Sequence, residues 1–109
     1  MNIQFKKGVL EMCVLAMLQQ KDWYGYDIAN TLSHRIDIAD GTIYPILRRL
    51  KQESYVTSYL KESSSGPPRK YYRITPGGTA LVEALRKEWD IFEKQVDHIM
   101  HQTDLEGRK

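Results

Sequence analysis

Apolar residues recur at helical spacing through the first half of the chain. From about residue 5 to residue 20 they lie on more than one side of the predicted helix, so we expect that helix to be covered on two faces. The segment KDWYGYD interrupts the pattern, and a second short helix is predicted to end near His34. A third helix is predicted from about Asp40 to Glu53. Its buried face, with apolar residues spaced by three and four, should consist of Ile43, Ile46, Leu47 and Leu50.

Pro45 stands inside the third predicted helix, where a proline is unusual. It lacks a backbone donor, and in a regular helix its ring clashes with the carbonyl four residues earlier. Two starts for this helix remain open. If the helix begins near Asp40, Pro45 lies just past the first turn and bends it, whereas a regular start at Tyr44 puts Pro45 at the first helical position at little cost.

The segment after the third helix has a different period and composition. Residues 55–60 and 71–75 are rich in β-branched and aromatic side chains, and they flank the turn-forming run ESSSGPP. This pattern predicts a β-hairpin with a mobile tip. Thr75 and Pro76 suit the N-cap and the first position of a last helix, although Gly77-Gly78 weakens its first turn.

The last helix carries a seam of apolar residues with heptad spacing. The seam consists of Val82, Leu85, Trp89, Phe92, Val96 and Ile99. Two such helices can pair with each other or pack against the first helix. The final residues DLEGRK have nothing to pack against and are expected to fray.

Three short helices, a hairpin and a long helix, in that order, are typical of a winged helix-turn-helix with an added helix. We therefore predict a mainly α fold with a small β-hairpin, in which residues 1–75 form a winged helix-turn-helix DNA-binding domain. Residues 76–103 should form a C-terminal dimerisation helix, and residues 104–109 a disordered tail. In this fold the third helix enters the DNA major groove, and the hairpin, or wing, touches the adjacent backbone.

The distribution of charge supports DNA as a partner. The formal net charge is only +2, but between Thr42 and Thr75 there are seven basic and two acidic residues, a local balance of +5. The rest of the chain is therefore acidic. The basic centre coincides with the third helix and the wing, the two elements that should meet DNA.

Several functional classes have no support in the residue pattern. The chain shows no nucleophile and base pair, no carboxylate cluster, no phosphate-binding loop and no metal constellation, so we expect no enzyme, cofactor or metal. The apolar run at residues 9–18 contains Glu11 and is shorter than the roughly 20 residues of a membrane span. No secretory signal is evident, and the single Cys13 cannot form an internal disulfide. We expect a cytoplasmic protein with no membrane partner.

Four segments together carry a resemblance to a known family. They are the leucine- and methionine-rich first helix, YGYDI at Tyr24–Ile28, GTIYPILRRL at Gly41–Leu50 and GPPRKYYRITPGG at Gly66–Gly78. In this order and spacing the chain resembles the PadR family of bacterial transcriptional regulators, in particular its compact subgroup with a single short C-terminal helix. The resemblance implies a homodimeric repressor that reads a palindromic operator and is released by a small, often aromatic, effector. Ala39 and Ser54 depart from the family pattern, which often has Ser or Asn at the first position and Gly at the second.

Residues of the third helix that avoid its apolar face should point outward, and the resemblance implies that this face reads DNA. Arg48 or Arg49 suits guanine edges, and Thr42 or Tyr44 suits a phosphate or a thymine methyl. For Arg49 a pair with a nearby carboxylate is the alternative. In the wing, small residues allow close approach to a phosphate and cations supply charge. The candidate DNA-binding residues are Thr42, Tyr44, Pro45, Arg48, Arg49, Lys61, Ser64, Ser65, Gly66, Arg69 and Lys70.

The resemblance also gives the heptad seam a role in dimerisation. The candidate dimer-interface residues are Leu10, Met17, Val82, Leu85, Trp89, Phe92, Val96 and Ile99. If the last helices pair across a dimer axis, two Trp89 rings approach each other and can form the walls of a slot for a flat aromatic effector. The candidate effector-binding residues are Trp89, Phe92 and Val14. Plain interface packing of Trp89 is the alternative.

One function of another class stays open, a winged-helix module for protein interaction without sequence-specific DNA reading. The two hypotheses differ in their dependence on salt. DNA binding weakens steeply as salt rises, because Lys and Arg displace condensed counterions from the duplex.

Overall fold

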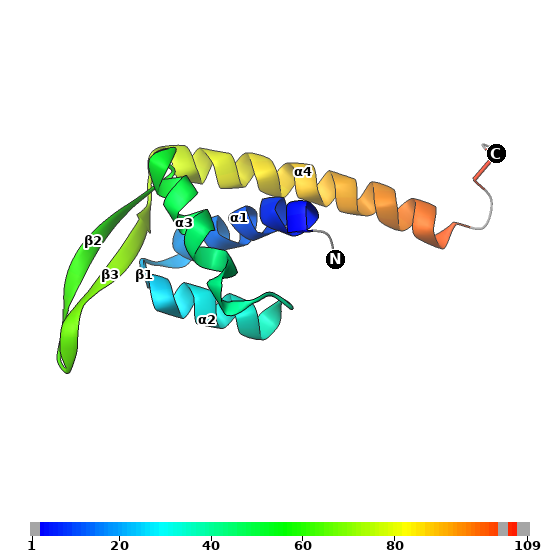
Figure 1. The fold of residues 1–109 in the computed structure, drawn as a ribbon. Coiled ribbons are helices and arrows are strands. Elements are labelled where there is room, and N and C mark those ends of the chain that lie inside the picture. Colours follow the sequence, from blue (N-terminus) through cyan, green and yellow to red (C-terminus); the bar gives the residue numbers. More distant parts are fainter. Residues whose placement is uncertain (1–2, 103–104, 107–109) are drawn as a thin grey trace.

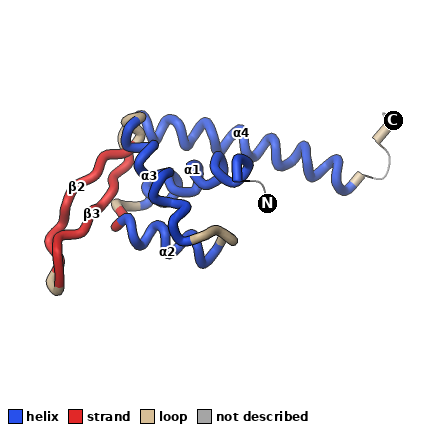
Figure 2. The backbone as a smooth tube through the Cα atoms, in the orientation of Figure 1, coloured by secondary structure: helices blue, strands red, loops and turns tan. Residues whose placement is uncertain are grey.

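Four α-helices, a short 3-10 turn and a three-stranded sheet make up the computed structural model of the chain (Figure 1), which describes residues 3–102 and 105–106. The elements are α1 (Ile3–Gln20), β1 (Trp23–Tyr24), α2 (Gly25–Arg35), η1 (Asp40–Thr42), α3 (Ile43–Gln52), β2 (Val56–Ser63), β3 (Gly66–Ile74) and α4 (Pro76–His101). The strands project from one end of the helical body and α4 extends beyond it at the other end (Figure 2). The predicted mainly α fold with a wing and a C-terminal helix is confirmed. Most of the predicted tail lies outside the described residues.

α1 occupies the centre of the molecule, and both α3 and α4 pack against it. The predicted coverage of this helix on two faces is therefore confirmed. The buried core consists of Leu10, Val14, Leu15, Leu18, Ile28, Ala29, Leu32, Ile43, Ile46, Leu47, Leu50, Val56 and Val82. It includes all four residues expected on the buried face of the third helix, so their burial fixes the rotation of α3 about its axis.

α3 begins at Ile43, between the two starts that the sequence left open. The preceding residues, Asp40–Thr42, form a 3-10 turn in which the Thr42 amide donates to the Ala39 carbonyl (3.1 Å). Pro45 is then the third residue of α3, within the first turn, where backbone N–H groups have no partner inside a helix. The proline therefore removes no hydrogen bond from α3.

A residue in the left-handed conformation closes the other end of α3. Ser54 has a φ of 64°, the only positive φ among the described non-glycine residues. The Tyr55 amide then donates to the Leu50 carbonyl (2.9 Å) and the Ser54 amide to the Lys51 carbonyl (3.0 Å). These two bonds form a Schellman motif, in which glycine usually takes the left-handed position. The departure of Ser54 from the family pattern thus leaves the helix end in place, at a local cost in backbone strain.

The sheet has the order β1-β3-β2, with β3 antiparallel to both neighbours. The residue pattern does not predict β1, because two residues are too few to show a strand period. Trp23 and Tyr24 of β1 pair with Tyr72 and Tyr71 of β3 and join the wing to the end of α1.

The wing, formed by β2 and β3, has longer strands and a shorter tip than predicted. The strands run Val56–Ser63 and Gly66–Ile74, so the tip is a two-residue turn instead of the loop ESSSGPP. Pro67 and Pro68 lie inside β3, where two residues face Glu62 and the pairing shifts register. Prolines are tolerated at such a bulge, because the ladder hydrogen bonds are already interrupted there.

Thr75 connects the wing to α4 as the predicted N-cap. Its side-chain oxygen accepts from the Gly78 amide (3.0 Å) and its hydroxyl lies 2.8 Å from the Ser54 carbonyl oxygen. A Cβ built on Gly78 would lie 2.1 Å from the Tyr55 carbonyl oxygen, so only glycine fits this approach of α4 to the end of α3. Gly78, expected to weaken the first turn, is thus a packing requirement.

Candidate nucleic-acid interface

The exposed face of α3 carries Tyr44, Arg48 and Lys51. Their spacing of four and three residues puts them on one side of the helix. Burial of the opposite face in the core directs these side chains to solvent. Thr42 is half-buried in η1, and Pro45 is exposed next to Tyr44.

A concave surface of about 430 Å³ lies between this face and the wing, and we call it the α3–wing groove. It is lined by Tyr44, Arg48 and Lys51 of α3, Lys70 and Tyr72 of β3, Tyr24 of β1, and Gly25 and Tyr26 of α2. The structure thus brings three of the predicted DNA-binding residues, Tyr44, Arg48 and Lys70, to one surface from two elements.

The α3–wing groove is basic. Among the described residues that line it there are three cations and no carboxylate. Burial raises the pKa of the Tyr72 phenol, and the nearby Arg48 guanidinium opposes that rise. A concave surface with this charge attracts the phosphate backbone of a nucleic acid.

Arg49 does not share this surface. Its Nε lies 2.6 Å from Oε2 of Glu11 in α1, and its Nη2 donates to Oε1 of the same carboxylate (3.0 Å). This two-bond pair raises the pKa of Arg49, mainly through the hydrogen bond to Glu11. One position along a helix turns a side chain by about 100°, so Arg49 points away from its neighbour Arg48 and reaches Glu11 of α1. The carboxylate pairing left open as an alternative for Arg49 is therefore present. Arg49 does not line the α3–wing groove, and its contact with DNA stays a prediction.

The two faces of the wing carry different cations. Lys70 faces the α3–wing groove, whereas the cross-strand pair Lys61 and Arg69 lies on the opposite face, because successive strand residues alternate. Both cations lie over tyrosine rings, with Lys61 5.0 Å from the centre of Tyr71 and Arg69 4.8 Å from the centre of Tyr24. The exposed tip presents Ser64, Ser65 and Gly66.

Sequence reasoning does not select Lys51 or Tyr26, although both line the α3–wing groove. Lys51 lies three residues after Arg48, so helical periodicity predicts that both side chains lie on the same face of α3. Tyr26 belongs to the segment YGYDI, next to a glycine with a packing role. A Cβ on Gly25 would lie 2.9 Å from Cε1 of Tyr72, so the glycine allows α2 to approach β3 closely.

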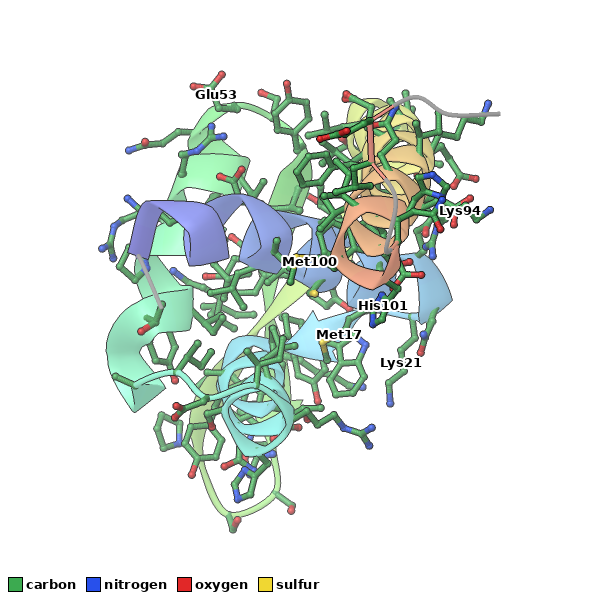
Figure 3. The ribbon with its side chains drawn as sticks, turned by 90° about the vertical axis from the view of Figure 1, so that its right-hand side faces the viewer. Met17, Lys21, Glu53, Lys94, Met100 and His101 are labelled. Carbon is green, nitrogen blue, oxygen red and sulfur yellow. The ribbon has the colours of Figure 1, made fainter. Side chains whose placement is uncertain are left out.

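A stripe of exposed apolar side chains runs along the C-terminal half of α4. The exposed fractions are 52% for Phe92, 39% for Val96, 58% for Ile99 and 72% for Met100. This half of the helix, which ends with Met100 and His101, faces the reader in Figure 3. It extends beyond the helical body at the end opposite the wing, and both projections contribute to the elongated dimensions of 64 × 29 × 21 Å.

Two apolar grooves adjoin this stripe, and Trp89 and Phe92 line both. One, of about 320 Å³, lies between α1 and α4 and includes Val9 and Met12. The other, of about 470 Å³, follows α4 to Met100. Sequence reasoning does not assign Val9 or Met12 to a site.

Three predicted interface or effector residues lie instead in the core of the chain. Leu10 is 1% exposed, and Val14 and Val82 are 0% exposed. Leu10 and Val14 of α1 and Val82 of α4 all belong to the buried core, so they present no surface to a partner or a ligand. The dimer-interface prediction for Leu10 and Val82 and the effector prediction for Val14 are corrected accordingly. Met17, Leu85 and Trp89 are half-buried and keep part of their surface.

A family model described as the transcriptional regulator PadR-like family matches residues 14–84, from the middle of α1 into α4. The chain belongs to this family. The match includes α3 and the wing, and the class of the protein is that of a DNA-binding transcriptional regulator, not an enzyme.

Similar proteins align with most of this PadR-like chain. The crystal structure of a PadR-like transcriptional regulator from Bacillus cereus is 36% identical, with a TM-score of 0.81, over 91% of this chain and 98% of that one. A Streptococcus transcriptional regulator is 37% identical, with a TM-score of 0.83, over 92% and 100% of the two chains. An uncharacterised protein of Lysinibacillus sphaericus is 35% identical over 86% of this chain and 90% of its own length. Within the described part of the PadR-like chain, no helix has the length and apolar character needed to span a membrane.

Proposed function

We propose that this PadR-like protein is a homodimeric repressor that reads a palindromic operator and is released by a small aromatic effector. The observation that carries the proposal is the α3–wing groove, where the cations of Arg48, Lys51 and Lys70 line one concave surface. Cations on two separate elements can bind phosphates on either side of a base-reading helix, which supports a duplex as the ligand.

The residues have different roles in this proposal. Arg48 reads a guanine edge in the major groove, and Tyr44 contacts a phosphate or a thymine methyl beside it. Lys70 binds a phosphate from the groove side of the wing. Lys61 and Arg69 extend the phosphate contacts to the other face of the wing, and the small residues of the tip let its backbone approach the duplex.

A second copy of the chain is proposed to cover the apolar stripe of α4. An exposed row of Phe92, Val96, Ile99 and Met100 is a typical interaction surface on a protein of this size. The heptad spacing of the seam allows the same stripe on two copies to pair around a two-fold axis. Such a dimer presents two α3 helices, and it should prefer half-sites about 10 base pairs apart, or a multiple of that, from centre to centre.

The effector is proposed to bind where the stripe meets α1. Trp89 and Phe92 line both apolar grooves there, and pairing of two α4 helices would enclose these grooves between two copies of each ring. A flat aromatic molecule between the rings gains apolar burial and stacking. Binding at this site changes the distance between the α4 helices and therefore between the two α3 helices.

The test is a footprint on the DNA upstream of the protein's own gene, with and without candidate aromatic compounds. We expect two protected half-sites and a loss of protection when the effector is added. Protection of a single half-site contradicts the dimer. Equal binding of upstream and scrambled duplex contradicts DNA reading and favours a protein-interaction module.

A further inference from the structure

Asp22, in the short link between α1 and β1, binds both strands of the wing. Its Oδ2 accepts a hydrogen bond from the Tyr59 hydroxyl of β2 (2.7 Å) and another from Nε of Arg73 in β3 (3.0 Å). The second contact is also a salt bridge. One carboxylate therefore reaches from the end of β1 across β3 to β2.

The strand register explains this reach. β1 pairs Trp23 with Tyr72, so Asp22 comes next to Arg73 where the β1–β3 ladder ends. Tyr59 lies diagonally from Arg73 on the same face of the wing, and the Arg73 guanidinium is 5.0 Å from the centre of its ring. None of these three cluster residues lines the α3–wing groove. The cluster occupies the opposite face of the wing.

Other contacts to β3 on this side come from Tyr24 of β1, whose ring stacks on Tyr71 (5.9 Å between ring centres) and lies under the Arg69 guanidinium. β1 supports β3 through two residue pairs and makes no ladder with β2. Beyond Tyr71 the wing is a two-stranded ribbon, a structure that is marginally stable alone and that twists readily. Asp22 itself is held to the body by its neighbour Trp23, whose Nε1 donates to the Met17 carbonyl in α1 (3.1 Å).

We propose that Asp22 is a positioning residue that sets the angle of the wing against α3, so that Lys70 and Arg48 face one duplex. Asp22 does not contact DNA in this account. The inference rests on the proposed DNA-binding function. If Asp22 only contributed its charge, removing it would have the opposite effect to loss of a positioning residue. A carboxylate repels the nearby phosphate backbone, so its removal would tighten DNA binding.

Two variants that each remove one carboxylate distinguish these effects. Glu62 is exposed in β2 near the wing tip, so Glu62→Ala changes the net charge by the same amount as Asp22→Ala. We expect Glu62→Ala to tighten binding to upstream duplex about twofold at low salt. We expect Asp22→Ala to weaken it by about threefold or more, despite the more positive charge, because phosphate contacts of the wing are lost.

The salt dependence separates mispositioning from a general loss of folded protein. Loss of one phosphate contact should reduce the slope of log Kd against log salt by about 1 in Asp22→Ala, whereas partial unfolding leaves the slope unchanged. Tyr59→Phe keeps the ring and the charge but removes one hydrogen bond to Asp22, and it should weaken binding in the same direction by a smaller factor. Asp22→Glu keeps a carboxylate and should recover part of the affinity.

Each outcome bears on the inference. Weaker binding and a lower slope for Asp22→Ala and Tyr59→Phe support it. If the wild type and Glu62→Ala bind the upstream duplex and Asp22→Ala binds as tightly as Glu62→Ala, the positioning role is overturned while DNA binding stands. If none of these proteins prefers upstream duplex to scrambled duplex, the proposed function fails and the positioning role fails with it.

Discussion

Ser54 carries a backbone cost that glycine would remove. A non-glycine residue in the left-handed region is strained by about 1–2 kcal/mol. Glycine would relieve this strain, but its greater freedom in the unfolded chain would offset part of the gain in stability. We therefore predict that Ser54→Gly raises the free energy of unfolding by about 0.5–1 kcal/mol, measured by chemical denaturation. Ser64→Gly in the wing tip, where φ is not positive, is the control and should bring no gain. An equal gain in both variants would contradict the strain at Ser54.

The adjacent glycines of α4 should respond in opposite directions to alanine. Gly78→Ala forces a Cβ against the Tyr55 carbonyl and should lower the free energy of unfolding by about 2 kcal/mol or more. At Gly77 the nearest atom is Thr75 Oγ1 at 3.7 Å, so Gly77→Ala should be neutral or stabilise α4 by up to about 1 kcal/mol. Thermal unfolding of the two variants measures the difference, and similar losses would argue against the close approach at Gly78.

Arg48 and Arg49, neighbours in sequence, should have different effects on DNA binding. Arg48→Ala should cost about 1–3 kcal/mol against the operator and relax preference at one base position. Arg49→Ala removes a pair with Glu11 and should leave the base preference unchanged. Binding to a panel of operator variants tests this. The assignment fails if both substitutions relax the same position.

At the scale of elements, the wing should contribute affinity without base preference. Lys70 faces the α3–wing groove from β3, where it can reach a phosphate. We predict that Lys70→Ala weakens binding to all sequences alike and lowers the salt slope by about 1. Titration of operator and random duplex at several salt concentrations measures both quantities. A loss confined to the operator would assign Lys70 to base reading instead.

The elements that the sequence predicts best are those whose apolar repeat extends over several residues or whose first residues form a specific helix cap. The apolar residues of α3 repeat over about two turns, from Ile43 to Leu50, and Thr75-Pro76 marks the start of α4 by its hydrogen-bonding chemistry. β1 and the outer part of the wing escape prediction because their pairing is set by tertiary contact. Two residues show no period, and Pro67-Pro68 ordinarily indicates a loop but here lies at a bulge.

The candidate site was predictable to a similar extent. Outward positions of α3 follow from its buried face, so Tyr44 and Arg48 could be placed on a shared surface. The partner of Arg49 could not, because Glu11 is 38 residues away and only the packing of α3 on α1 brings it near. Leu10 and Val14 were misassigned for a related reason, since a helix that is apolar on several sides does not indicate which side faces its own core.

At the scale of the whole molecule, the stripe of α4 should control assembly. Val96→Asp puts a charge in the centre of the stripe and should shift the protein from dimer to monomer at micromolar concentration in sedimentation experiments. Lys87→Asp, an exposed position outside the seam, is the control and should leave the dimer intact. A Val96→Asp protein that sediments with the wild type would exclude this stripe as the interface.

Binding of the wild-type protein to duplex from its own upstream region, compared with a scrambled duplex across a range of salt, tests the central claim most directly. If α3 and the wing form one DNA-reading surface, the upstream duplex should bind at least about a thousandfold more tightly than the scrambled one. Both affinities should fall steeply as salt rises. Equal affinity for the two duplexes at every salt concentration would contradict the account.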